Sequence, residues 1–445
     1  MSNQIFIARQ DTLDEKIIPA QLLNDYKLHG EYSFVFHTPE LWHKMCTHAY
    51  AANDQKVNGD ALEYVLTKAA PTGSYSLSNW MALLCDTAEQ AAQGLYAGIE
   101  TAGQLAQSSA AMAAVSNSET AMAAVSGSEM AMNSICSVKT ALRAFAASKH
   151  WNSTVKENDM AIAKAAVALA NSTEFSTISS CAEMAENSTA MSVLAASETA
   201  MSVLAASETA MSVLAASETA MSVLAASETA MSVLADSATA RTALTGSSYY
   251  GKYMQNDTMC IAKLVVGFAN IASASYSSMA GVAADATAMN AVAASSTAMN
   301  AVAASAVALH AICKTGSARA AFIKSSYRDT NYDTILANLK NTTYFTMVVN
   351  NGYMENKENL YYYNGTRQAT TEVLSADNSF ILIGNLQSYT DRDLCYVYDL
   401  QSGSTIAHYN DATLRQAKLV IPGGVKVKGI YGGSGHTTYY AFKAK

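Results

Sequence analysis

Residues 197–206 read SETAMSVLAA, and this ten-residue unit recurs almost without error between residues 190 and 235. Looser arrays with the same period precede and follow it, over residues 112–145 and 289–312. The large apolar residues of the regular array fall at two phases, at Met191, Met201, Met211, Met221 and Met231 and at Leu194, Leu204, Leu214, Leu224 and Leu234. An internal repeat of this regularity predicts a repeat architecture.

Each unit favours a short helix. Ala, Met, Leu and Glu are strong helix formers, and the large apolar residues are spaced three or four apart. Ser197 stands where an N-cap belongs, and Glu198 follows in the first turn, where a negative charge suits the helix dipole. The same serine returns at Ser207, Ser217 and Ser227. The pattern predicts helices of about two turns, each broken at its serine.

One continuous helix fits the period less well. Ten residues at about 100° each rotate the apolar stripe by roughly 80° per unit, so no continuous seam forms. We therefore expect short stacked helices whose alanine faces allow close approach. The sequence leaves open whether these helices pack within one chain or between three, and a disordered low-complexity tract is the alternative.

A longer repeat is superimposed on the decapeptides. Residues 159–164 read DMAIAK, and the similar run TMCIAK follows 99 residues later at 258–263. The arrays end alike, with aromatic or basic residues after Ser148, Ser247 and Ser325. We interpret the ranges near 149–185 and 249–280 as capping blocks that seal the ends of stacks.

The two ends of the chain differ from the repeats. Residues 1–105 have an ordinary composition and are predicted to be an attachment region, and residues 106–328 form the repeat shaft. Residues 329–445 are predicted to form a β-rich tip domain, because β-favouring residues alternate there with polar turns. Eight candidate strands lie at 344–349, 360–363, 380–383, 395–400, 405–409, 418–421, 425–430 and 437–442. They favour an antiparallel β-sandwich. The expected fold is thus mixed α and β and elongated.

Composition excludes several classes of function. Charged residues make up only 14% of the chain and no basic run occurs, so nucleic acid is not an expected partner. No run of 18 apolar residues predicts membrane insertion, and the start of the chain lacks the pattern of a signal peptide. A surface so poor in charge favours an oligomer. The scattered cysteines are interpreted as reduced.

Candidate site residues are few. His37, His43, Cys46 and His48 contain ligand-type atoms, but their spacing fits no zinc module, so no metal is predicted. The aspartates at 391, 393 and 399 with His408 resemble a turn more than a glycosidase pair, so no catalytic residue and no cofactor are assigned. Tyrosines of the tip could stack on sugar rings of a receptor or simply pack the sheet. These possible contact residues are Tyr361, Tyr363, Tyr396, Tyr398, Tyr439 and Tyr440.

The repeats resemble a known group of proteins. Residues 287–295, TAMNAVAAS, are similar to the tandem units of bacteriophage tail-fibre and related virion appendage proteins, and the resemblance covers roughly residues 105–325. The run GGSGHTTYYAFK at 432–443 also resembles the ending of phage structural proteins. The resemblance implies a homotrimeric fibre with its N-terminus on the virion and its C-terminus distal. It carries over no functional residue.

Together these observations predict a non-enzymatic structural protein of a phage virion, assembled in the host cytoplasm. Its N-terminal region would bind tail, baseplate or neck proteins, and its C-terminal domain would contact a host glycan or protein. A neck or collar whisker, or a connector that binds other virion proteins, is the alternative within this class. A capsule-degrading tailspike is the alternative outside it.

Overall fold

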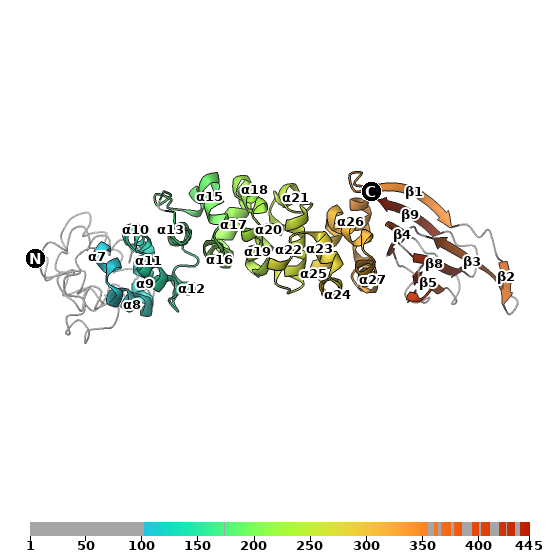
Figure 1. Ribbon diagram of the computed structural model, residues 1–445, viewed down its shortest axis with the longest axis horizontal. Coiled ribbons are helices and arrows are strands. Elements are labelled where there is room, and N and C mark those ends of the chain that lie inside the picture. Colours follow the sequence, from blue (N-terminus) through green and yellow to red (C-terminus); the bar gives the residue numbers. More distant parts are fainter. Residues whose placement is uncertain are drawn as a thin grey trace, which may run out of the picture. The chain divides into compact units, whose positions relative to one another are not determined.

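The computed structural model describes residues 102–172, 174–354, 360–363, 366–374, 378–384, 394–399, 402–409, 418–423, 425–431 and 437–445. The chain divides into two compact units, Met1–Leu224 and Ala225–Lys445, and each is considered by itself. The protein is mixed α and β, with helices through the repeats and strands near the C-terminus (Figure 1). The predicted domain boundaries at 105/106 and 328/329 remain predictions.

Short helices follow the decapeptide period in both units. In the first unit they are α7 (Ala102–Gln107), α8 (Ser109–Asn117), α9 (Glu119–Gly127), α10 (Glu129–Ser137), α11 (Lys139–Ala146), α12 (Trp151–Thr154), α13 (Asp159–Leu169), α14 (Cys181–Glu186), α15 (Ser188–Ala195), α16 (Glu198–Ala206) and α17 (Glu208–Ala216). Helix α18 (Glu218–Ala226) crosses the boundary between the units.

The second unit continues the pattern and adds two 3-10 turns. Its helical elements are α19 (Glu228–Asp236), α20 (Ala238–Gly246), α21 (Tyr250–Tyr253), α22 (Thr258–Phe268), η4 (Ser273–Ser275), α23 (Met279–Ala284), α24 (Ala286–Ala294), α25 (Ser296–Ala304), α26 (Ala306–Lys314), α27 (Gly316–Lys324), η5 (Asp329–Asn331) and α28 (Tyr332–Leu339).

The serine between successive units is the N-cap, as predicted. The Ser197 hydroxyl accepts a hydrogen bond from the backbone N–H of Ala200 at 3.3 Å, and that of Ser207 accepts one from Ala210 at 3.0 Å. A serine whose hydroxyl binds the third amide after it begins a helix and satisfies one of its unpaired amides. The chain turns sharply at each cap, by 102° between α15 and α16 and by 100° between α25 and α26.

The helices form a coil with three helices per turn. In the first unit α13 packs on both α10 and α16, and in the second unit α22 packs on both α19 and α25. Serines also link consecutive turns: the Ser217 hydroxyl donates to the carbonyl of Ala185 at 3.1 Å, and that of Ser325 donates to Ala293 at 2.6 Å. Within each unit the decapeptides therefore coil inside one chain, which answers a question that the sequence left open.

The two apolar phases of the decapeptide form the inner face of the coil. Met201 and Leu204 are completely buried, as are Met211 and Leu214 of the next unit. Ala200 and Ala205 are buried beside them and let the turns approach closely. Since the chain changes direction after every unit, the drift of the stripe that would spoil one long helix does not accumulate.

The longer repeat defines two equivalent modules, one in each unit. We name helices α10 to α17 the first module and helices α19 to α26 the second module. In each module the 11-residue helix, α13 or α22, packs between the array before it and the array after it. These helices continue the coil within their units. The capping role of the blocks near 149–185 and 249–280 stays a prediction.

Equivalent corners of the modules are held by different side chains. In the first module the Glu157 carboxylate accepts the backbone N–H groups of Glu208 at 3.1 Å and Thr209 at 2.8 Å, at the start of α17. In the second module, the side-chain oxygen of Asn256 accepts a hydrogen bond from the backbone N–H of Ala306 at 2.9 Å, at the start of α26. Burial alone would raise the pKa of Glu157, but these hydrogen bonds and nearby Lys156 bring it below its ordinary value of 4.5.

The C-terminal region contains two antiparallel sheets, with strand orders β1-β9-β4-β7 and β2-β3-β8-β5-β6. The strands are β1 (Phe345–Met354), β2 (Leu360–Tyr363), β3 (Thr366–Leu374), β4 (Ser379–Gly384), β5 (Leu394–Asp399), β6 (Thr405–Tyr409), β7 (Leu419–Pro422), β8 (Val425–Tyr431) and β9 (Thr437–Ala444). The predicted switch from helices to antiparallel strands is confirmed.

Two details of the strand prediction were wrong. Strand β3 was missed because its sequence, TRQATTEVL, is polar, yet it pairs with β2 on one side and β8 on the other. The first candidate strand was predicted to end at residue 349, but β1 continues to Met354 with a shift of register between Val349 and Gly352. A bulge explains this, because it places an extra residue in one strand without ending the pairing.

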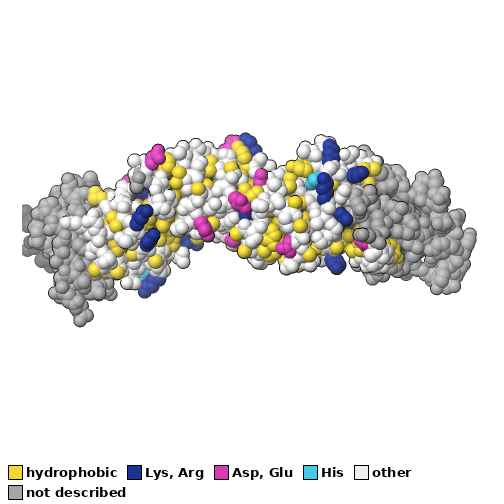
Figure 2. Space-filling model, in the orientation of Figure 1, with side chains coloured by type: hydrophobic (Ala, Val, Ile, Leu, Met, Phe, Trp, Pro, Cys, Tyr) yellow, Lys and Arg dark blue, Asp and Glu magenta, His cyan; other side chains and the backbone are white. Residues whose placement is uncertain are grey.

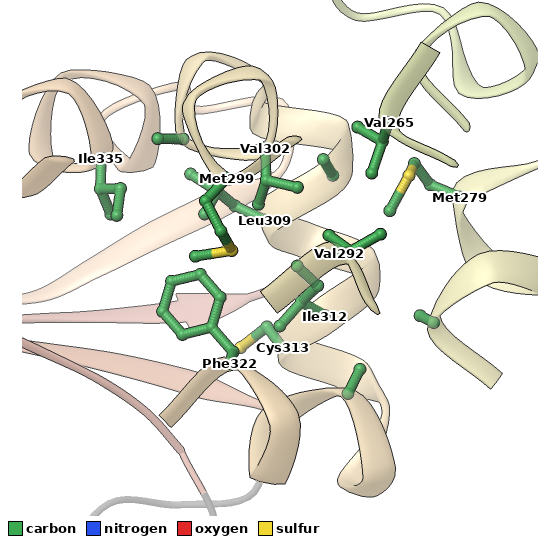
Figure 3. Packing of buried hydrophobic residues seen from close by; sticks show 14 of the residues in the cluster. Val265, Met279, Val292, Met299, Val302, Leu309, Ile312, Cys313, Phe322 and Ile335 are labelled. Atoms are coloured by element: carbon green, nitrogen blue, oxygen red, sulfur yellow. The ribbon is translucent and has the colours of Figure 1, made fainter. Parts of the chain in front are cut away.

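The sheet β1-β9-β4-β7 and the end of the coil share one hydrophobic core. The ring of Phe322 in α27 lies 5.8 Å from that of Phe380 in β4, which in turn lies 6.3 Å from Phe345 in β1. Figure 3 shows Met299 directed toward the ring of Phe322 within this cluster. At its edge, the carboxylate of Asp329 accepts the backbone N–H of Val420 at 2.9 Å. The strands thus cover apolar side chains of the last helices.

Candidate functional site

The six predicted contact tyrosines lie on strands that are not neighbours. Tyr361 and Tyr363 are on β2, Tyr396 and Tyr398 are on β5, and strands β3 and β8 lie between β2 and β5. The remaining two positions, Tyr439 and Tyr440, are on β9 in the other sheet. The structure therefore distributes these residues over three strands.

Only two of these side chains are described. Tyr398 and Tyr440 are both half-buried, and Tyr440 packs against the shared core. This contact is the packing role that the sequence offered as the alternative to receptor binding. A receptor role for the set remains a prediction.

The other sequence candidates contribute little within the described residues. His37, His43, Cys46 and His48 lie outside them, as do Asp391 and Asp393. The Asp399 carboxylate accepts the backbone N–H of Ser402 at 2.6 Å, which places it in a turn. In the described part of the chain, no group of three or more His, Cys, Asp or Glu side chains could hold a metal ion.

Charge and hydropathy were also considered for a surface site. On the face drawn in Figure 2, acidic and basic side chains of the described residues are scattered singly or in small groups. Among the described residues no single helix is long and apolar enough to cross a membrane, although three pairs of helices bent by about 100° pass on length and composition.

Each module contains a buried lysine at the same place in its long helix. Lys164 in α13 and Lys263 in α22 are 4% and 0% exposed. The Lys164 ammonium lies 3.1 Å from the Glu129 carboxylate, and that of Lys263 lies 3.5 Å from Glu228. Each carboxylate is on the helix one turn earlier in the coil, so the ion pair ties consecutive turns together.

The same lysines also hold the loop that follows the long helix. Lys164 donates to the carbonyl of Ser176 at 3.3 Å, and Lys263 donates to that of Ser273 at 3.2 Å. A second acceptor is needed because a buried ammonium is costly unless its hydrogen bonds are satisfied. Sequence reasoning missed these residues, although a lysine recurring in the middle of an otherwise apolar run was a usable signal.

Asparagine ends both long helices and directs the loops. Asn171 and Asn270 have φ angles of 58° and 57°, in the left-handed region. The amide of the next residue then returns to the helix: Ser172 N–H donates to Val167 at 3.3 Å, and Ile271 N–H donates to Val266 at 2.9 Å. This is the hydrogen-bonding pattern of a Schellman C-cap, in which asparagine is a common alternative to glycine.

In the first module a cavity lies beside the buried lysine. Its volume is about 420 Å³. Residues of α10 and α13, Lys139 of α11 and the loop after α13 line it, namely Asn133, Cys136, Ser137, Lys139, Lys164, Val167, Ala168, Asn171, Ser172, Phe175 and Ser176. Burial raises the pKa of the Cys136 thiol to about 12, so it is protonated and a poor nucleophile at neutral pH.

At the equivalent place in the second module, the long helix and the loop after it contact α19 directly. Gly267 replaces Ala168, and a Cβ atom there would lie 2.1 Å from the carbonyl oxygen of Ala235. Ser273 reaches the earlier helix, where its N–H donates to Asp236 at 3.0 Å and its hydroxyl donates to the Ser232 carbonyl at 2.8 Å. The close backbone approach at Gly267 and the hydrogen bonds of Ser273 thus hold this part of the second module against α19.

Comparison with known proteins adds no identification. No protein-family model matches this chain, and no curated protein matches it.

Proposed function

We propose that this chain is a non-enzymatic structural component of a bacteriophage virion, an elongated tail fibre that contacts the host surface. The observation that supports this best is the decapeptide coil, in which a serine cap and a small apolar core repeat with almost no other chemistry. Such a sequence determines the distance between the two ends of the repeat region, because each added unit extends the coil by the same step. The C-terminal strands would form a β-sandwich at the tip.

The proposed fibre is a homotrimer. The repeat core itself needs no sister chain, since Met201, Leu204 and their equivalents are already buried within one chain. Subunit contacts would therefore involve other surfaces. Strand β1 is at the edge of its sheet, and its Met347 and Val348 side chains are 38% and 62% exposed. Exposed apolar residues on an edge strand favour association with another chain.

The two ends would have different partners. Residues 1–105 would bind tail, baseplate or neck proteins, and the tip would bind a host glycan or protein through its tyrosines. Three tips on one fibre would add avidity to a weak contact. A whisker or connector that binds only virion proteins, and a tailspike that degrades capsule, are the competing functions.

Sedimentation velocity of the full chain tests the assembly, because it yields mass and frictional ratio together. A particle of three times 47.0 kDa with a high frictional ratio is the expected result. A compact monomer would overturn the trimeric fibre and leave a self-contained coil of open function.

Binding of the fluorescently labelled full chain to bacterial cells separates the competing functions. Saturable binding supports the fibre, and binding only to purified virion parts supports the whisker or connector. Release of oligosaccharides from capsule during the incubation would replace the structural proposal with the tailspike.

A further inference from the structure

The cavity of the first module lies between α10, α13 and the loop after α13. At the equivalent position of the second module, Gly267 lets α22 approach the backbone of Ala235 closely. In the first module the methyl group of Ala168 lines the cavity in place of that contact. The cavity is open to solvent, since Lys139, Asn171 and Ser176 of its lining are exposed, so a ligand can enter it and displace its water. The volume of about 420 Å³ is within the range of small-molecule sites.

The lining has an apolar part and a cationic part. Val167, Ala168, Phe175 and the protonated thiol of Cys136 provide apolar surface with one aromatic ring. Lys164 lies at the buried end, but Glu129 and the Ser176 carbonyl already satisfy its ammonium.

A second lysine is available to a ligand. Lys139 also lines the cavity and is an exposed residue. No hydrogen bond or ion pair joins its side chain to another residue that the structure describes. One free cation beside an apolar space complements a ligand with one negative charge and an apolar body.

We propose that this cavity binds a small amphiphilic anion, an aromatic or aliphatic body with a single carboxylate or sulfonate group. Phe175 and Val167 contact the body, and Lys139 pairs with the anionic group. Lys164 keeps its pair with Glu129 and fixes the loop that holds Phe175. This binding is separate from the structural role proposed above and does not depend on it.

The probe is 8-anilino-1-naphthalenesulfonate, an anionic aromatic amphiphile whose fluorescence rises in apolar sites. We expect the full chain to bind it at one saturable site in the micromolar range. Decanoate should displace it, because it offers the same combination of anion and apolar body. Absence of saturable binding up to about 1 mM would overturn the proposal.

Two variants locate the site. Ala168→Leu fills the cavity and should weaken binding about tenfold or more, whereas Ala206→Leu, an exposed helical alanine in the same unit, should leave it unchanged. Circular dichroism checks that both variants fold. Equal binding by wild type and a folded Ala168→Leu variant would contradict the assigned site.

Lys139→Gln tests the charge. It should weaken binding of the sulfonate about threefold, as expected for one exposed ion pair, and leave its neutral counterpart N-phenyl-1-naphthylamine unaffected. Lys149→Gln, another exposed lysine of the first unit, is the matched control. If Lys139→Gln weakened both probes equally, or neither, the role of Lys139 would be refuted.

Discussion

The first and second modules both place a long helix with a buried lysine between two arrays, yet they differ beside that helix: the first has a cavity there, whereas in the second the helix and its loop contact α19 directly. The difference begins at one methyl group, Ala168 against Gly267, and continues in the loop after the long helix, where Ser273 binds back to α19. The serine caps and the two apolar phases of the repeat determine the path of the backbone. They do not determine how much space lies between consecutive turns of the coil. Individual residues between the turns then decide how closely they pack.

The largest expected effect comes from exchanging the residue types at the two positions, which adds a methyl group at Gly267 and removes one at Ala168. Gly267→Ala places a Cβ atom 2.1 Å from the Ala235 carbonyl oxygen. It should destabilise the second module by about 2–3 kcal/mol, because overpacking against backbone costs the upper end of its usual range or more, which exceeds the roughly 1 kcal/mol that alanine gains in helix propensity. Ala168→Gly should cost about 1 kcal/mol, from helix propensity alone. Hydrogen exchange of α22 and α13 measures both. Equal losses would mean that the close approach at Gly267 is not specific to the second module.

A smaller effect should follow from removing the partner of each buried lysine. Glu228→Gln should lower stability by about 1–2 kcal/mol, a value reduced because this carboxylate is 59% exposed. Glu129→Gln should cost less, since water in the neighbouring cavity can solvate Lys164. Exchange protection of the two long helices compares them. A larger loss for Glu129→Gln would show that the cavity does not admit water to the lysine.

The smallest effect is a difference in acid sensitivity between the corners of Glu157 and Asn256. The folded pKa of Glu157 is lowered, so its stabilisation is present above its unfolded pKa and is lost as pH falls through the folded value. Glu157→Gln should cost about 0.5 kcal/mol at pH 7, discounted for solvent screening, and nothing in strong acid.

Urea unfolding of the variant and the wild type at several pH values measures this effect. Asn256→Asp is the matched change and should introduce the same pH dependence in the second module. A pH-independent loss in Glu157→Gln would assign the effect to packing instead of charge.

The parts of the fold that depend on local sequence could be predicted. Ser197 and Ser207 begin helices because a hydroxyl before an alanine-rich unit meets its amides within three residues. The number of helices per turn could not be predicted, because it depends on the angle at each corner. Strand β3 was missed because its residues are polar and only its pairing with β2 and β8 reveals it.

The candidate site was beyond prediction for a similar reason. The recurring lysine was visible in the sequence, but its carboxylate partner lies 35 residues away, one turn earlier in the coil. The cavity depends on the distance between two helices, which Ala168 and Gly267 set through tertiary contact. Neither distance is encoded in a local pattern.

Three helices per turn also determine how the repeat array can change in length. Nearly identical decapeptide units between residues 190 and 235 can be gained or lost whole, because each unit carries its own cap and its own buried Met and Leu. One unit more or less would turn the coil that follows by a third of a turn, while each helix of the array would still meet an equivalent unit as its third neighbour. Only changes of three units return the same face of the coil to the same direction, so length variants that preserve the alignment of surface contacts should differ by multiples of about thirty residues.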